Sequence, residues 1–198
     1  MKRRSVLAAT GILLGTVDTG CLVSENRDGN SGNETAYLRI RNVAPDSVPL
    51  LPATPAVSVA DREGTAAAPA SIAIRWRNDG EESIRLGEAR SVSFQTAQSD
   101  EGSAYLLGDR WREWDDTVDF EDCWFVSGTV GGDAESRTIE LTPGETFEAE
   151  SRLYANDNEC LTGGAYRFRT SVSVRGPPGA EHAERGDWGF VLEVETER

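Results

Sequence analysis

Residues 166–174 read Tyr-Arg-Phe-Arg-Thr-Ser-Val-Ser-Val, an alternation of two kinds of side chain along the whole stretch. The aromatic and β-branched residues fall on one side, and Arg167 and Arg169 fall on the other. Successive side chains of a β-strand point to opposite faces, so a period of two predicts a strand. Because only one side is apolar, the stretch indicates a β-sheet that buries one face.

The same alternation recurs on both sides of this stretch. The inward-facing sets are Ile72, Ile74 and Trp76; Val92 and Phe94; Phe147, Ala149, Ser151 and Leu153; and Phe190, Leu192 and Val194. Tyr37–Val43 predicts a first strand, and Val48–Pro69, rich in Pro and Ala, predicts an irregular segment along an edge. Turn sequences such as Asn78-Asp79-Gly80 separate these runs. The pattern predicts an all-β fold, a two-sheet antiparallel sandwich of about seven or eight strands.

The order of these segments resembles the immunoglobulin-like sandwich over residues 70–195. The matching features are a strand ending at Asn78, then Phe94, a Trp-bearing middle, residues 139–145 (Ile-Glu-Leu-Thr-Pro-Gly-Glu) and residues 164–168 (Gly-Ala-Tyr-Arg-Phe). This sandwich is found in many surface proteins, including the domain type first known from intracellular proteinase inhibitors. The resemblance implies a fold, and a fold does not carry a function with it.

The charge balance indicates a protein that works in concentrated salt. The chain has 34 Asp and Glu against 20 Lys and Arg, and Lys2 is its only lysine. Such an excess of acids repels itself in dilute buffer, whereas molar salt shortens the screening length to about 3 Å. This composition resembles that of haloarchaeal proteins. The negative charge also argues against nucleic acid as a partner.

Residues 1–20 read as an export signal. Arg3 and Arg4 precede an apolar run, Val6–Val17, that is shorter than the roughly 20 residues of a membrane-spanning helix. The arginine pair resembles a twin-arginine signal, and Thr19-Gly20-Cys21 resembles the end of a lipobox, although Asp18 stands where the lipobox usually has an aliphatic residue. The resemblance implies cleavage before Cys21 and a lipid on its sulfur. The lipid would hold the protein to the membrane at the extracellular face of the cell.

The next segment, 21–35, is rich in Asn, Gly and Ser and predicts a flexible tether. It contains a sequon for N-glycosylation at Asn33. The predicted organisation is therefore a signal at 1–20, a lipid-anchored tether at 21–35 and the sandwich at 36–198.

Three cysteines, an odd number, are explained if Cys21 carries the lipid and Cys123 pairs with Cys160. An oxidising exterior favours such a disulfide. A metal site on the same two cysteines would need further His or Cys nearby in the sequence, and there are none.

Arginines recur in pairs two residues apart, at Arg39/Arg41, Arg75/Arg77 and Arg167/Arg169. They could form an anion or glycan patch, or they could pair with acids on neighbouring strands. The immunoglobulin-like topology favours pairing, with Glu148 and Glu150 beside the second pair and Glu193 and Glu195 beside the third.

Aromatic and acidic residues mix between Trp111 and Phe125. The candidate ligand-binding set is Trp111, Trp114, Asp115, Asp116 and Asp119. Several carboxylates could hold Ca²⁺, and the rings could stack on a sugar. However, the Asp spacing does not match a calcium loop, so no metal is predicted, and Trp124 is expected to pack near the disulfide.

No catalytic motif was found, and the single histidine, His182, has no neighbouring nucleophile. The sequence therefore predicts a non-catalytic surface lipoprotein without a cofactor, which binds or contacts an envelope protein or glycan. Two alternatives stay open: a proteinase-inhibitor-type binder, and a solute- or carbohydrate-binding protein that uses the Trp111–Trp124 segment.

Overall fold

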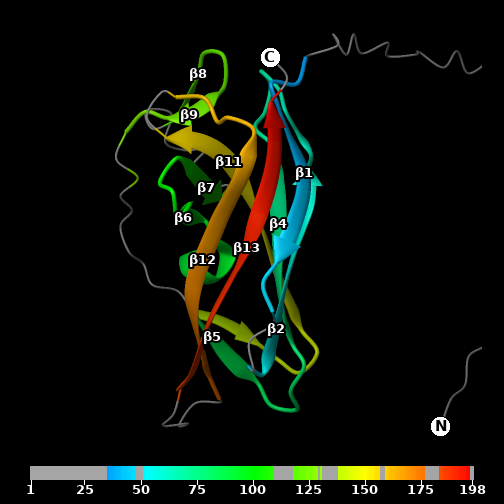
Figure 1. Ribbon diagram of the computed structural model, residues 1–198. Helices are drawn as coiled ribbons and strands as arrows, with labels where there is room; N and C mark the ends of the chain where they lie inside the picture. The colour runs from blue at the N-terminus through cyan, green and yellow to red at the C-terminus, as the bar shows by residue number, and fades with distance from the viewer. Residues whose placement is uncertain are drawn as a thin grey trace, which may run out of the picture. The chain divides into compact units, whose positions relative to one another are not determined.

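A computed structural model describes residues 35–47, 51–108, 118–128, 130, 138–156, 159–176 and 183–196, except for the side chains of residues 90, 118 and 119. These residues form two β-sheets that pack face to face (Figure 1). None of the helices in these ranges has the length and the apolar character that crossing a membrane requires.

The first sheet has six strands, all paired antiparallel. In their order across the sheet they are β10 (Thr138–Leu141), β5 (Ile84–Glu88), β12 (Gly164–Arg175), β13 (Ala183–Thr196), β1 (Leu38–Pro45) and β3 (Glu63–Gly64). The alternating residues 166–174 lie within β12, which pairs with β13 over its full length.

The second sheet has seven strands. Five form a continuous path: β2 (Ala53–Asp61), β4 (Ser71–Asn78), β11 (Thr146–Asn156), β7 (Ala104–Gly108) and β6 (Thr96–Gln98). The other two are β8 (Val118–Phe120) and β9 (Trp124–Val126). β4 pairs with β11 as far as Arg152, and β9 joins β11 in parallel at Ala155.

The predicted all-β, immunoglobulin-like two-sheet sandwich is confirmed. The described residues contain thirteen strand segments, more than the seven or eight expected, because several are only two or three residues long. Short pieces of this kind give no readable alternation in a sequence.

Aromatic side chains from both sheets meet in the core. Trp76 on β4 and Trp188 on β13 are 0% and 1% exposed, and their ring centroids lie 5.5 Å apart. Phe94 contacts Phe190 across 4.9 Å between centroids. The residues predicted to face inward thus form the interface between the sheets, and their burial supplies the main favourable free energy of folding.

Two local predictions were wrong. Val92–Gln95 is not a strand: α1 (Ala89–Ser93) is a short helix, and Phe94 follows it with a left-handed φ of 52°. A single helical turn can bury two nearby residues as a strand does, so a short alternation does not distinguish them. Within the range predicted to be irregular, Ala53–Asp61 does lie along an edge of a sheet, but it forms the regular strand β2. An edge strand tolerates Pro55 because the outer side of its backbone needs no partner in the sheet.

The predicted charge ladders are right for Arg75 with Glu148 and wrong for the pair Arg167/Arg169. Arg75 lies opposite Glu148 and binds it. In contrast, Arg167 and Arg169 lie opposite Val191 and Gly189 rather than beside Glu193 and Glu195. In the register that pairs β12 with β13, Glu193 and Glu195 lie farther along β13 than the residues opposite Arg167 and Arg169.

The arginines of the third pair have other acidic partners. Arg167 binds Asp46 with 2.7 Å between the nitrogen and the carboxylate oxygen, and Arg169 binds Asp100 at 2.8 Å. Glu195 instead lies opposite Arg39 and forms an ion pair with Arg41. Arg77 lies opposite Thr146 and pairs with Asp79 at 3.2 Å. Pairing was thus the correct expectation for these arginines, although several partners differ.

Candidate functional site at the disulfide end

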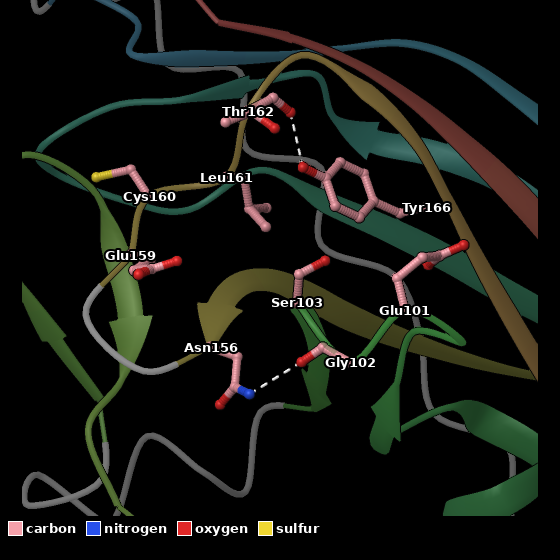
Figure 2. Close-up of a pocket in the computed structure, with 9 residues that line it drawn as sticks. All are labelled: Glu101, Gly102, Ser103, Asn156, Glu159, Cys160, Leu161, Thr162 and Tyr166. Atoms are coloured by element: carbon pink, nitrogen blue, oxygen red, sulfur yellow. Dashed lines mark hydrogen bonds between the residues drawn. The ribbon is translucent and has the colours of Figure 1, made fainter.

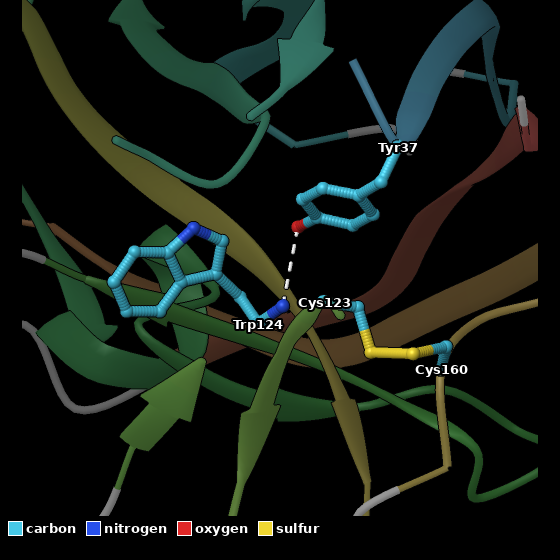
Figure 3. The surroundings of a disulfide bond; sticks show 4 residues. All are labelled: Tyr37, Cys123, Trp124 and Cys160. Carbon is cyan, nitrogen blue, oxygen red and sulfur yellow. Dashed lines mark hydrogen bonds between the residues drawn. A yellow bond between two sulfur atoms is a disulfide. The ribbon is translucent and has the colours of Figure 1, made fainter. Parts of the chain in front are cut away.

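A disulfide joins Cys123 to Cys160, as predicted (Figure 3). Cys123 directly precedes β9, and Cys160 lies between β11 and β12. The two Cα atoms are 5.7 Å apart. The bond therefore ties β9 of the second sheet to the chain segment that enters β12 of the first sheet.

An aromatic cluster lies on one side of the disulfide. Trp124 donates its backbone N–H to the Tyr37 hydroxyl at 3.4 Å and its indole N–H to the Thr65 carbonyl at 2.9 Å. Phe120 lies near both rings, with its centroid 5.2 Å from that of Trp124 and 6.0 Å from that of Tyr37. Burial raises the pKa of Tyr37 to about 12, so this hydroxyl stays protonated near neutral pH. The cluster fastens the β8–β9 segment to the beginning of β1.

A polar pocket of about 430 Å³ lies next to Cys160 (Figure 2). It is formed by the β6–β7 turn, the end of β11 and the segment before β12. Its lining residues are Glu101, Gly102, Ser103, Asn156, Glu159, Cys160, Leu161, Thr162 and Tyr166. We call this space the disulfide pocket.

Hydrogen bonds hold the walls of the disulfide pocket. Asn156 donates its side-chain N–H to the Gly102 carbonyl at 2.9 Å and its backbone N–H to the Ser103 carbonyl at 3.0 Å. On the opposite wall, the Tyr166 hydroxyl donates to the Thr162 carbonyl at 2.7 Å. These bonds connect β11 to the β6–β7 turn and brace the segment that follows Cys160.

The remaining polar groups define what the pocket can recognise. The Ser103 and Thr162 hydroxyls and the Glu101 and Glu159 carboxylates belong to exposed residues. Neither glutamate forms an ion pair with any residue in the described part of the chain. Carboxylates accept hydrogen bonds and repel anions. The pocket therefore suits a neutral, hydroxyl-rich ligand or a cationic one.

Over the described ranges, no group of three or more His, Cys, Asp or Glu residues could hold a metal ion.

Most of the residues singled out from the sequence lie outside the described ranges. These are Arg3, Arg4, Cys21, Asn33, Trp111, Trp114, Asp115 and Asp116. Only the backbone of Asp119 is described, and it pairs with Phe125 between β8 and β9. Trp124 follows Cys123 in the chain, but its indole ring points away from the disulfide (Figure 3) and packs, half-buried, against the cluster of Leu107, Val126 and Tyr154.

Sequence reasoning did not identify the residues of the disulfide pocket. Ser103, Asn156 and Thr162 come from three separate segments of the chain, and none belongs to a recognisable motif. The available clue was the polar run Asn156–Glu159 immediately before Cys160, because a disulfide can hold such a turn against a neighbouring strand.

Comparison with known proteins gives little further information. No protein-family model matches the chain, and a search of curated proteins finds no match. Among solved structures, the chain is similar to self-complemented MyfA, the major subunit of Myf fimbriae from Yersinia enterocolitica, in complex with galactose. The identity is 10% and the TM-score is 0.32, and the match covers 73% of this chain and 99% of that one.

Proposed function

We propose that this protein is a non-catalytic lipoprotein on the outer surface of a halophilic cell, and that its sandwich binds or contacts another component of the envelope. The Cys123–Cys160 disulfide is the observation that carries the proposal. Disulfides persist in oxidising compartments and are rare in reducing cytosol. The bond supports export, and it leaves Cys21 as the odd cysteine available for a lipid.

The binding role is supported by the arrangement of the disulfide end. The bond, the aromatic cluster and the Asn156 hydrogen bonds brace the turns around one polar pocket. Loops held by a rigid scaffold are the usual place for recognition. The sequence supports a non-catalytic role, since His182 has no nucleophile beside it.

The anchor is tested by expressing the full chain in a haloarchaeal host and separating membranes from medium. Wild type is expected in the membrane fraction, and Cys21→Ser is expected in the medium because it lacks the sulfur that takes the lipid. Ser24→Ala, a change of similar size in the same segment, serves as the control. If Cys21→Ser stays with the membranes, the anchor is wrong. If wild type remains in the cytosol with its leader attached, the whole proposal is wrong.

A second candidate, recognition of a neutral sugar, is favoured by the disulfide pocket itself. Its hydroxyls can donate hydrogen bonds to sugar hydroxyls and accept them, its carboxylates can accept them, and its volume of about 430 Å³ fits a small glycan unit. The pocket residues differ from the Trp111–Trp124 segment that the sequence suggested for the same role.

Two sets of variants separate these two sugar sites. In a titration with neutral glycans, Glu101→Gln and Glu159→Gln should weaken binding if the disulfide pocket is the site. Trp111→Ala and Trp114→Ala should weaken it if the aromatic segment is the site. Glu150→Gln, on the outer face of β11, is the control for the loss of one negative charge. Absence of glycan binding by wild type would reject both.

The inhibitor-type alternative stays a prediction from the resemblance alone. Inhibition of a proteinase by the purified protein, lost on cleavage of an exposed loop, would support it. Absence of inhibition across the main proteinase classes would reject it.

A further inference from the structure

Three arginines lie close together at one end of the first sheet, where β12 ends. None of them forms an ion pair with an acidic residue in the described part of the chain. Arg85 on β5 lies directly opposite Arg175 on β12. Ser173, two residues before Arg175, lies opposite Arg185 on β13. Directly opposite residues have Cβ atoms about 4.5–5.5 Å apart, and diagonal ones about 7–8 Å, which long side chains can span. Arg85, Arg175 and Arg185 therefore surround Ser173, and we call this group the arginine face.

The arginine face belongs to the outer, solvent side of the sheet. Leu86 and Val174, which are the strand neighbours of Arg85 and Arg175, are 0% and 2% exposed and belong to the core. Because successive strand residues point to opposite faces, Arg85 and Arg175 point away from the core. The strand order β5–β12–β13 at this end can be followed in Figure 1.

The absence of partners sets these arginines apart. Within the described ranges, no ion pair and no side-chain hydrogen bond involves Arg85, Arg175 or Arg185. The other arginines whose side chains are described all have partners: Arg39, Arg41, Arg62, Arg75, Arg77, Arg152, Arg167 and Arg169. On a chain with 34 acidic residues, three neighbouring unpaired cations are unexpected.

Arg85 has a further unusual feature. Its Nε–H is buried and has no hydrogen-bond partner. Glu140 on β10 lies directly opposite it on the other side, yet no ion pair joins the two. A buried donor without an acceptor is unfavourable, and so are like charges directly opposite each other. A bound anion that lies between Arg85 and Arg175 would offset the repulsion between their charges and accept hydrogen bonds from their terminal N–H groups.

The surface here also has room for such an anion. A hollow of about 230 Å³ is lined by Arg85, Leu86, Gly87, Glu88, Thr138, Ser173 and Arg175, so it contains two of the three arginines and one acidic residue, while Arg185 lies beside it. A Cβ on Gly87 would come within 2.7 Å of the Ser173 hydroxyl oxygen. Because residue 87 is glycine, no side chain there displaces the Ser173 hydroxyl from the floor of the hollow, where it can donate a hydrogen bond.

We propose that the arginine face binds a sulfate or phosphate group. Guanidinium groups present paired N–H donors whose geometry matches the oxygens of an oxyanion. Three guanidinium groups and one hydroxyl together supply more donors than a single carboxylate accepts. A tetrahedral dianion has the oxygens and the charge to engage all three. This site differs from the disulfide pocket, which is lined by two glutamates and by no arginine.

The proposal is tested by calorimetric titration of the full chain at constant high ionic strength set with NaCl. The probes are inorganic sulfate, glucose 6-sulfate, glucose 6-phosphate and glucose. Saturable binding is expected for the charged probes, and none for glucose. Tighter binding of the esters than of inorganic sulfate would identify a modified glycan as the source. Equal binding would identify the free anion. No binding by wild type would overturn the proposal.

Variants locate the site. Arg175→Gln and Arg185→Gln, both at exposed positions, should each weaken binding by about fivefold or more, because each removes a charge-assisted fork. Arg85→Gln should do the same and should also remove an Nε–H resonance that shifts on titration in ¹H–¹⁵N spectra of wild type. Arg75→Gln removes the same charge from the other sheet and should bind like wild type. If Arg75→Gln weakens binding as much as Arg175→Gln does, the effect is general electrostatics and the site is wrong.

Discussion

Arg75 on β4 and Glu148 on β11 lie directly opposite each other and form a two-point ion pair. The Arg75 Nε–H donates to one carboxylate oxygen at 2.8 Å, and a terminal nitrogen donates to the other at 3.2 Å. This pair is the part of the predicted ladder that the fold realises. Glu150, two residues along β11, lies opposite Ala73, and no ion pair joins it to an arginine in the described ranges.

The pair predicts a difference in acid stability between two otherwise similar variants. The hydrogen bond from Arg75 lowers the pKa of Glu148 below its ordinary value of 4.5. A lowered pKa in the folded state contributes stability that is present above the unfolded pKa and is lost as pH falls through the folded one. Glu148→Gln should therefore lose part of the acid dependence of unfolding, whereas Glu150→Gln should keep it. Denaturant titrations across the acid range in low salt measure this, and equal behaviour of the two variants would contradict it.

The two core tryptophans predict unequal costs for the same substitution. Trp76 donates its indole N–H to the Val92 carbonyl at 2.8 Å, whereas the buried Trp188 indole N–H has no partner. Trp76→Phe loses a hydrogen bond as well as volume, but Trp188→Phe also removes an unsatisfied donor. Trp76→Phe should therefore be more destabilising by about 1–3 kcal/mol. Equal losses in chemical denaturation would show that the unpaired N–H has no energetic cost.

The Pro143–Glu145 turn predicts a purely conformational penalty. Gly144 has a φ of 77°, and a Cβ there would meet no atom within 4 Å. Gly144→Ala should cost about 1–2 kcal/mol because L-residues disfavour the left-handed region. Gly164, at the start of β12, also has open space but no positive φ, so Gly164→Ala should be nearly neutral. A neutral Gly144→Ala in thermal unfolding would argue against this turn geometry.

The disulfide predicts both a thiol count and a loss of stability. In unreduced protein unfolded in denaturant, Cys123 and Cys160 should not react with thiol reagents, and two further free thiols would contradict the bond. The bond closes a sequence separation of 37. Replacing both cysteines with Ser should cost about 4 kcal/mol on the chain-entropy estimate. Cys21→Ser, which leaves the bond intact, should unfold like wild type.

The charge excess predicts strong dependence on salt. The unfolding midpoint should rise steeply from low to molar NaCl, because screening suppresses repulsion among the acidic residues. Matched concentrations of sucrose, which does not screen charge, should raise the midpoint much less. A flat response to NaCl would reject the halophile interpretation.

The sequence alone determined the sheets, the faces and the disulfide. Alternation decides which side of a strand is apolar, so the inward positions of β4, β11, β12 and β13 could be assigned without a structure. Alternation gave the wrong secondary structure at Val92–Gln95, because one helical turn buries the same residues. It also missed the edge strand at Ala53–Asp61, because Pro and Ala obscured the pattern there. Cys123 and Cys160 could be paired because only one other cysteine exists and it lies at the leader.

Only the tertiary structure decided which side chains meet. Arg167 binds Asp46, 121 residues away in the sequence, instead of the glutamates of β13. The disulfide pocket and the arginine face each gather residues from three separate segments. Such contacts depend on strand register, where a shift of one residue turns every side chain to the other face. Alternation is the same in every register that keeps the apolar faces together, so it cannot choose the partner opposite a given residue.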